Sequence, residues 1–267
     1  MSSSTFKSAS GDGYEMQMGR WSRRLADPFL DFAGFADGES VLDVGCGTGS
    51  LSRTIASKAR IRAVTGIDYS PAYIEHARLH ETDARIHYRI GDACLLSFDD
   101  ASFDRVLSLL VLHFVPKPEL AIAEMRRVAR QGATVAAAVW DARGGFVANR
   151  IFFDTAAALD ARGNARRARN YTRPLTQPGE LAAAWRNAGL IDVFDTSLTI
   201  RMEYSCFDDF WTPNVGQDGP GAEYVGTLDI DARTKLQQAV RLAYLDGEED
   251  GPRSYAATAW AVKGRAP

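Results

Sequence analysis

Short apolar runs alternate with segments of helical spacing along the middle of the chain. Residues 51–59, for example, place Leu51, Ile55 and Ala59 on one helix face. Near-continuous apolar strands separated by helices are typical of a parallel sheet covered on both faces, and right-handed crossovers then give a doubly wound α/β fold. The predicted strands are 41–44, 63–67, 86–90, 103–109, 133–140, 193–202 and 255–262. The predicted helices are 51–59, one that Ser70 caps and Pro71 opens, 118–130, 179–188 and 234–245.

The two ends of this alternating region differ in character. Residues 1–13 are rich in serine and glycine, which predicts a flexible N-terminus. Residues 14–35 have roughly helical spacing, and Pro28 within them predicts two short helices or one with a break. The stretches 142–178 and 204–253 are rich in Arg, Gly, Pro and aromatic residues. We interpret them as helical lid insertions into a single domain that spans 14–267.

Composition narrows the class of protein. The 267 residues are 46% hydrophobic and 24% charged, with 31 Lys+Arg against 34 Asp+Glu, which fits one folded soluble protein. A net charge of −3 argues against a protein built to coat nucleic acid or an anionic membrane. The three cysteines form no CxxC pair, so no zinc site is indicated and no metal is expected. The sequence shows neither a secretory signal nor a membrane span, so the expected location is the cytoplasm.

The glycine cluster after the first predicted strand is the most informative segment. In Val41–Ser50 a strand enters a tight turn and a helix leaves it, which puts the turn in the binding crevice at the carboxyl edge of the sheet. A dinucleotide site would need G-x-G-x-x-G, but Ser50 stands where the third glycine belongs. Asp68 ends the second strand, where a carboxylate can accept hydrogen bonds from ribose hydroxyls. Asp92 ends the third strand and suits an adenine amine.

Four segments in order carry a resemblance to a known family. Residues 41–50, 66–68, 91–93 and 103–106 resemble the successive motifs of class I S-adenosylmethionine-dependent methyltransferases. The small-molecule branch that includes the ubiquinone/menaquinone biosynthesis methyltransferases is the most similar. The resemblance implies a seven-stranded, mostly parallel sheet in the order 3-2-1-4-5-7-6 with the last strand antiparallel. It also implies methyl transfer from S-adenosyl-L-methionine to a small-molecule acceptor by in-line displacement, with S-adenosyl-L-homocysteine as product.

The resemblance further implies which residues contact the cofactor. Main-chain atoms of the glycine turn would follow its methionine part, Asp68 would hold both ribose hydroxyls, and Asp92 would meet the adenine amine. Tyr69 would flank the adenine, and Leu109 would offer its carbonyl to the amino group. The full implied set is Tyr14, Arg20, Gly45, Cys46, Gly47, Asp68, Tyr69, Asp92, Ala93 and Leu109.

His113 is the candidate general base. It follows the fourth predicted strand, at the edge where the transferred methyl group would point, although a histidine that only packs there is an equally good interpretation. Phe114, Trp140, Phe146 and Trp211 are candidate walls of an apolar acceptor pocket. One basic run indicates either a solvated helix face or a site for an anionic acceptor. Its members are Arg162, Arg166, Arg167, Arg169 and Arg173.

Three classes of function remain open. The first is a small-molecule methyltransferase, the second a nicotinamide-dependent oxidoreductase, and the third an S-adenosylmethionine-binding protein without transfer activity. No Asn-Pro-Pro-Tyr-like segment of enzymes that methylate DNA bases follows the fourth strand, so no nucleic-acid partner is expected. The expected partners are a small-molecule acceptor and at most a second copy of the chain, as monomer or homodimer without membrane insertion. The lid segments carry no motif that identifies the acceptor atom.

Overall fold

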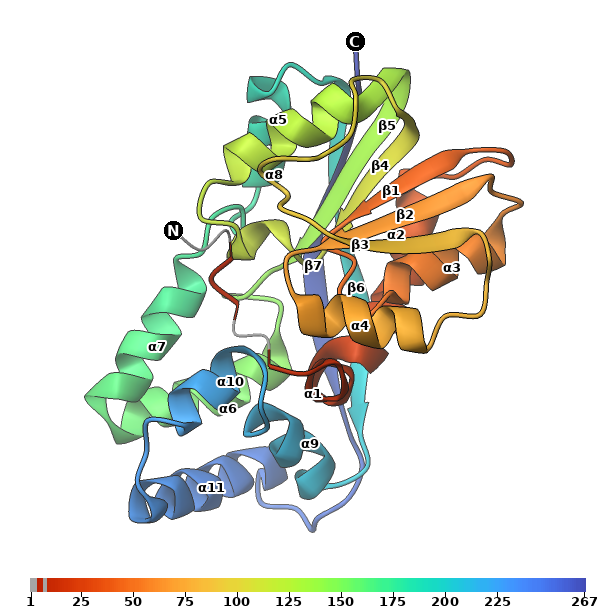
Figure 1. The fold of residues 1–267 in the computed structure, drawn as a ribbon. Coiled ribbons are helices and arrows are strands. Elements are labelled where there is room, and N and C mark those ends of the chain that lie inside the picture. The colour runs from red at the N-terminus through yellow and green to blue at the C-terminus, as the bar shows by residue number, and fades with distance from the viewer. Residues whose placement is uncertain (1–3, 7–8) are drawn as a thin grey trace.

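The computed structural model describes residues 4–6 and 9–267, and its centre is a seven-stranded sheet (Figure 1). Its order is β3-β2-β1-β4-β5-β7-β6, as predicted. Strands β1 to β5 are parallel, and β7 runs antiparallel to both of its neighbours. The strands are β1 (Ser40–Val44), β2 (Ala63–Asp68), β3 (Ile86–Ile90), β4 (Phe103–Leu109), β5 (Ala129–Trp140), β6 (Ile191–Tyr204) and β7 (Arg253–Arg265).

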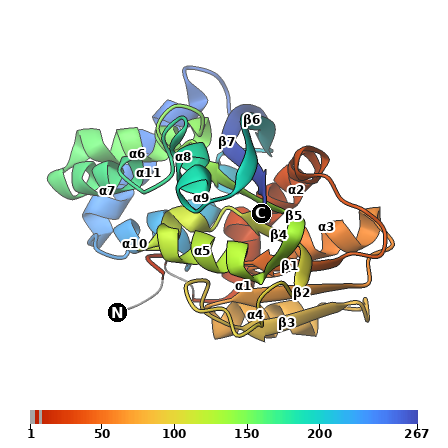
Figure 2. The ribbon, with the colours of Figure 1, turned by 90° about the horizontal axis from the view of Figure 1, so that it is seen from above.

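Helices cover both faces of the sheet, as Figure 2 shows from above. One face packs against α2 (Arg20–Ala33), α3 (Ser50–Lys58) and α4 (Pro71–Leu79), and the other against α5 (Pro118–Val128) and α8 (Glu180–Asn187). The central strands are apolar on both sides because each face meets a helix layer. In β1, for example, Val41 belongs to one hydrophobic cluster and Leu42 to the other, and both are buried. The predicted doubly wound α/β architecture is confirmed.

The stretches 142–178 and 204–253 form helices at one end of the molecule. Figure 1 shows them gathered on the side away from α5 and α8. We call these the lid helices: α6 (Val147–Leu159), α7 (Ala161–Tyr171), α9 (Phe207–Asn214), α10 (Gly219–Val225) and α11 (Ile230–Leu245). Aromatic side chains hold them together. Phe152 packs against Trp211 with ring centroids 6.0 Å apart, and Phe207 packs against Tyr244 at 5.7 Å.

The N-terminal helical segment differs from the prediction in two ways. Helix α1 (Gly11–Tyr14) begins before the expected start at Tyr14, and Ser10 caps it by accepting a hydrogen bond from the Gly13 N–H. The predicted break at Pro28 is wrong, because α2 continues through that residue with Leu25 and Phe29 fully buried. The irregular turn is instead a π-helix, η1 (Glu15–Gly19), which joins α1 to α2. Tertiary packing here outweighs the cost of one missing hydrogen bond.

Candidate functional site

The glycine turn leaves β1 through three residues with left-handed backbone. Gly45, Gly47 and Gly49 have φ of +75°, +55° and +94°. A Cβ on Gly45 would lie 2.3 Å from the Val111 side chain, and one on Gly49 would lie 2.2 Å from the Tyr88 hydroxyl. A Cβ on Gly47 would have only an ordinary contact of 3.6 Å with the Tyr14 ring. Gly45 and Gly49 are therefore required by packing as well as by backbone shape, whereas Gly47 faces the more open space.

Asp68 fixes that turn to the end of β2. One of its carboxylate oxygens accepts a hydrogen bond from the Gly47 N–H at 2.9 Å, and the other accepts from the Ser70 N–H at 2.8 Å. Burial raises the pKa of this carboxyl, and the main-chain N–H groups of Ser70, Gly47 and Tyr69 oppose that shift. An ionised carboxylate has about four acceptor positions, so the side chain keeps acceptor capacity for hydroxyl donors. This chemistry fits the paired hydroxyls of a ribose.

Asp43, in β1 just before the turn, has a different environment. It is fully buried, accepts a hydrogen bond from the Ser52 hydroxyl at 2.7 Å and has no partner within the described chain for its second oxygen. Burial raises the pKa of Asp43 to about 7. Asp43 lies behind the glycines and does not line the pocket, so it stabilises the turn.

A large pocket lies at the carboxyl ends of β1 to β4. Eight of the predicted site residues line it: Tyr14, Gly45, Gly47, Asp68, Tyr69, Asp92, Ala93 and His113. Cys46 and Leu109 are buried beside it but do not line it. Arg20 does not line it either, because its guanidinium forms an ion pair with Asp209 at 2.9 Å and stacks on the Trp21 ring at 4.2 Å. The main chain after Leu109 turns through Leu110, which has a φ of +66° and lines the pocket.

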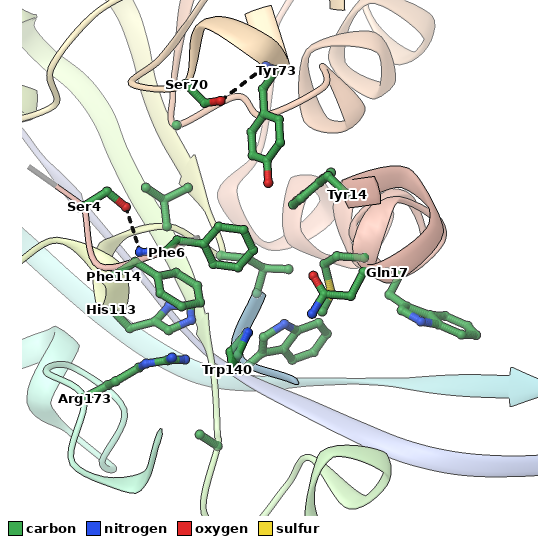
Figure 3. Close-up of a pocket in the computed structure, with 18 of the residues that line it drawn as sticks. Ser4, Phe6, Tyr14, Gln17, Ser70, Tyr73, His113, Phe114, Trp140 and Arg173 are labelled. Carbon is green, nitrogen blue, oxygen red and sulfur yellow. Dashed lines mark hydrogen bonds between the residues drawn. The ribbon is translucent and has the colours of Figure 1, made fainter. Parts of the chain in front are cut away.

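The N-terminal segment closes one side of this pocket. Figure 3 shows Tyr14, Tyr73 and Phe6 directed into it from different parts of the chain. Tyr14 shares a hydrogen bond of 3.0 Å with the Ser22 hydroxyl, and its ring lies 5.0 Å from that of Tyr73. Phe6 packs edge-on against Phe114 at 4.7 Å. The described residues of the predicted flexible segment 1–13 therefore make specific contacts at the pocket, and residues 1–3 and 7–8 lie outside the described chain.

The part of the pocket beyond the glycine turn is mainly apolar. Phe114, Trp140 and Phe146 line it as expected, with Phe153 and Met202 added from the lid and β6. Trp211 does not line it, because its ring packs between Phe152 and Phe207 in the lid core. The polar residues Gln17, Asn149 and Asn170 also line the pocket, and no spacing in the sequence distinguishes them from exposed amides.

His113 lies on a 3₁₀ turn, η2 (Leu112–Phe114), directly after β4. It is only 2% exposed, lines the pocket, and its Nδ1 has no hydrogen-bond partner within the described chain. Burial, with a smaller effect of Arg173, holds its pKa well below 6.5. The imidazole is therefore neutral at physiological pH, which is the form that can accept a proton.

The described part of the chain contains neither a metal site nor a membrane-spanning helix. Among the described residues, no three His, Cys, Asp or Glu side chains are grouped so that they could hold a metal ion. His76 and His80 stack with ring centroids 4.1 Å apart, and His80 turns its Nδ1 toward the His76 carbonyl. Over the same part of the chain, no helix is long and apolar enough to cross a membrane.

The sequence matches a known family over its central strands. Residues 42–137 match the family model described as a methyltransferase domain. The ubiquinone biosynthesis O-methyltransferase of Xanthomonas axonopodis pv. citri is 34% identical over 158 residues, which cover 57% of this chain and 63% of that protein. The ajmaline N-methyltransferase of Rauvolfia serpentina is 35% identical over 121 residues, 42% of this chain and 41% of that protein. The chain thus spans less than two thirds of the length of these curated relatives.

A solved structure extends the likeness to the whole fold. The phosphoethanolamine N-methyltransferase 2 of Haemonchus contortus, in complex with phosphomonomethylethanolamine and S-adenosylhomocysteine, has a TM-score of 0.59 at 17% identity. The match covers 96% of this chain and 57% of that one, and at this identity it concerns the fold alone. The matched domain, the relatives and the strand order agree with one another. Residues 42–137 therefore match a methyltransferase domain, and the overall fold is similar to that of a solved methyltransferase.

Proposed function

We propose that this protein transfers the methyl group of S-adenosyl-L-methionine to a small organic acceptor. The observation that carries the proposal is that the glycine turn, Asp68 and Asp92 line the same pocket as an apolar chamber closed by the lid. One end of the pocket thus offers polar groups suited to a nucleoside, and the other offers a dry space beside it. Methyl transfer needs alignment and exclusion of water more than it needs acid or base groups.

The residues of the polar end fit the cofactor. The positive-φ glycines bring main chain to the pocket surface with no side chain in the way, as close approach to a ligand requires. Asp68 would hold the ribose with its remaining acceptor capacity, and Asp92 would accept from the adenine amine beside Ala93. Tyr69, which is half exposed, would cover the adenine. Gly45, Cys46 and Gly47 would lie along the methionine part, and Leu109 would receive its amino group.

Of the two N-terminal residues expected at the cofactor, Tyr14 lines the pocket and Arg20 does not. Tyr14 lines the pocket opposite Gly47 and is in a position to close over the methionine end. Arg20 would have to leave Asp209 to reach the same place. We therefore assign the closing role to Tyr14 and keep Arg20 as a second contact that depends on a rearrangement.

When bound, the cofactor supplies a methyl group already activated by its sulfonium. The chain then has to hold the acceptor in line, keep water out with Phe114, Trp140 and Phe146, and receive a proton where the acceptor carries one. We assign the last task to His113, whose Nδ1 is unpartnered and whose low pKa keeps it neutral. A low pKa also makes it a weak base, so it suits an acceptor that loses its proton readily.

Two assays test the proposal. Isothermal titration calorimetry should show one S-adenosylhomocysteine bound per chain and no binding of NAD, which separates a methyltransferase from a nicotinamide-dependent oxidoreductase. Transfer of labelled methyl from S-adenosylmethionine to a panel of small acceptors should then give methylated product. Cofactor binding without transfer to any member of a broad panel would favour the alternative of a binding protein without transfer activity.

A further inference from the structure

In the part of the chain that the structure describes, four of the five arginines in the basic run form ion pairs with acidic side chains, and one does not. Arg166 and Arg169 both form ion pairs with Glu223, at 2.9 and 3.5 Å. Arg162 pairs with Asp160 at 3.3 Å and Arg167 with Asp154 at 3.3 Å, so each of these four arginines has an acidic partner within the lid. Arg173 follows the end of α7 and is different from the other four. Among the described residues it has no ion-pair partner and no side-chain hydrogen bond.

Arg173 is directed into the pocket. Its guanidinium lies 4.3 Å from the centre of the Phe114 ring, and Figure 3 shows it beneath His113 and Phe114, reaching toward Trp140. Burial, and next the nearby charge of Arg166, lower its pKa to about 9, while Glu223 opposes the shift and Arg169 adds to it. The side chain is still protonated at neutral pH. It is therefore a cation held in a mainly apolar chamber without a counter-ion, which is an unfavourable state unless a ligand supplies one.

Other buried polar atoms without partners surround the same space. Both polar atoms of the Asn170 side chain lack a partner, although the residue is only 1% exposed. The Trp140 Nε1, the Asn149 Oδ1 and the His113 Nδ1 are also buried and unpartnered within the described chain. All four residues line the pocket with Arg173. Buried polar groups are nearly always hydrogen-bonded in native proteins, so these atoms are available as partners for a ligand that enters the cavity.

We infer that the methyl acceptor is an apolar, aromatic-sized organic acid whose carboxylate binds Arg173. The inference rests on the proposed function, since it names the acceptor class for that site. A carboxylate matches the planar guanidinium fork, and its single negative charge balances the single unpaired cation. The Asn170 amide and the Trp140 N–H are further donors for its oxygens, while Phe114, Phe146 and Phe153 surround the apolar body. A cationic amine, in contrast, would meet like charge in this chamber.

The test is a binding comparison between matched pairs of aromatic acids and amides. Protein saturated with S-adenosylhomocysteine is titrated with a set of hydroxybenzoates and with the corresponding hydroxybenzamides, which have the same shape and no charge. We expect at least one acid to bind the wild-type protein about tenfold or more tightly than its amide. Acids that bind no better than their amides, or a set in which no acid binds, would overturn the inference.

Variants then assign the preference to one residue. Arg173→Gln should reduce the acid-over-amide ratio to near one, and Arg173→Lys should keep part of it because the charge remains. Arg169→Gln is the matched control, since Arg169 belongs to the same run but is largely exposed, pairs with Glu223 and lies outside the pocket. A preference that survives in Arg173→Gln would also contradict the assignment. Titration of S-adenosylhomocysteine into each variant separates this result from a failure of the proposed function, which would abolish cofactor binding in the wild type as well.

Discussion

The carboxylate of Asp68 accepts a hydrogen bond from the main-chain N–H of Gly47 at 2.9 Å. This contact joins the end of β2 to the turn after β1, two segments that the parallel pairing of Val44 with Ile67 already places side by side. The residue proposed to hold the ribose therefore also shapes the turn proposed to hold the methionine part. The Asp68 side chain therefore couples a ligand at the ribose position to the backbone of the glycine turn.

Asp68→Ala should weaken S-adenosylhomocysteine binding more than tenfold, about 1.5–3 kcal/mol, because charge-assisted hydrogen bonds to the ribose are lost. It should also lower the melting temperature, because the N–H groups of Gly47 and Ser70 lose their acceptor. Calorimetric titration and thermal melting measure the two effects. Asp229→Ala is the matched control, since Asp229 caps α11 by accepting from the Ala232 N–H and lies outside the pocket. An unchanged dissociation constant in Asp68→Ala would remove the ribose assignment.

Gly47→Val should abolish cofactor binding and cost stability. A branched side chain at a φ of +55° strains the backbone by roughly 1–2 kcal/mol, and it would fill space next to Tyr14 that the ligand needs. Gly132→Val provides the control, because Gly132 has a φ of +76° with no atom near its Cβ position. Both variants should lose comparable stability in urea unfolding, and only Gly47→Val should lose S-adenosylhomocysteine binding. Normal binding by Gly47→Val would mean that the turn does not touch the ligand.

Asp43 should make stability depend on pH. Its pKa is about 7 in the folded protein against an ordinary 3.8, so between these values the folded state keeps a proton that the unfolded state has lost. The free energy of unfolding contributed by this group therefore falls as pH rises from about 4 to about 7. In Asp43→Asn that decline should be absent, so the variant should gain stability relative to wild type between pH 5 and pH 8. Urea unfolding at the two pH values measures it, and an equal difference at both would contradict the burial of a protonated Asp43.

His113→Ala should lower turnover by roughly 10²–10⁴-fold and leave the affinity for S-adenosylhomocysteine nearly unchanged, if His113 is the base. Because burial holds its pKa well below 6.5, the wild-type rate should be level around neutral pH and fall only at acid pH, where the imidazole becomes protonated. His80→Ala, an exposed histidine outside the pocket, is the control. A variant with unchanged turnover and only a lower melting temperature would leave His113 with a packing role.

Asp218 should anchor the N-terminal segment to the lid. It is 1% exposed at the start of α10 and accepts hydrogen bonds from the Tyr73 hydroxyl at 2.9 Å and the Ala9 N–H at 2.5 Å. Asp218→Asn turns part of this acceptor into a donor, so the amides of Ala9 and Ser10 should exchange hydrogen faster. Asp229→Asn on α11 is the comparison variant. Protection that is equal in wild type and Asp218→Asn would show that other contacts hold the segment.

Much of the sheet could be predicted from the sequence because the central strands β1, β4 and β5 are mainly local apolar runs. Chain order and right-handed crossovers then limit the topology, and the carboxyl ends of neighbouring strands bring Gly47, Asp68 and Asp92 to one edge. Pro28 shows where local reasoning fails, since its helix survives through burial against partners that the local pattern does not reveal.

The residues that line the acceptor chamber could be predicted only in part, because segments far apart in the sequence come together to form it. The arginine run looks uniform in the sequence, and only the position of Glu223 on α10 shows which members are neutralised. The family resemblance implies a cofactor contact for Arg20, yet Asp209 on α9 holds it in an ion pair. Lid helices pack by aromatic contacts without a periodic signal of their own, so Asn170 could not be placed at the pocket in advance. Arg173 could be proposed for an anionic acceptor only as one member of its run.

The most direct test of the account is calorimetric titration of S-adenosylhomocysteine into the wild-type protein and into Asp68→Ala. We predict one molecule bound per wild-type chain and a dissociation constant more than tenfold higher in the variant. Absence of binding to the wild type, or equal binding by the two proteins, would contradict the claim that the glycine turn and Asp68 form the cofactor site.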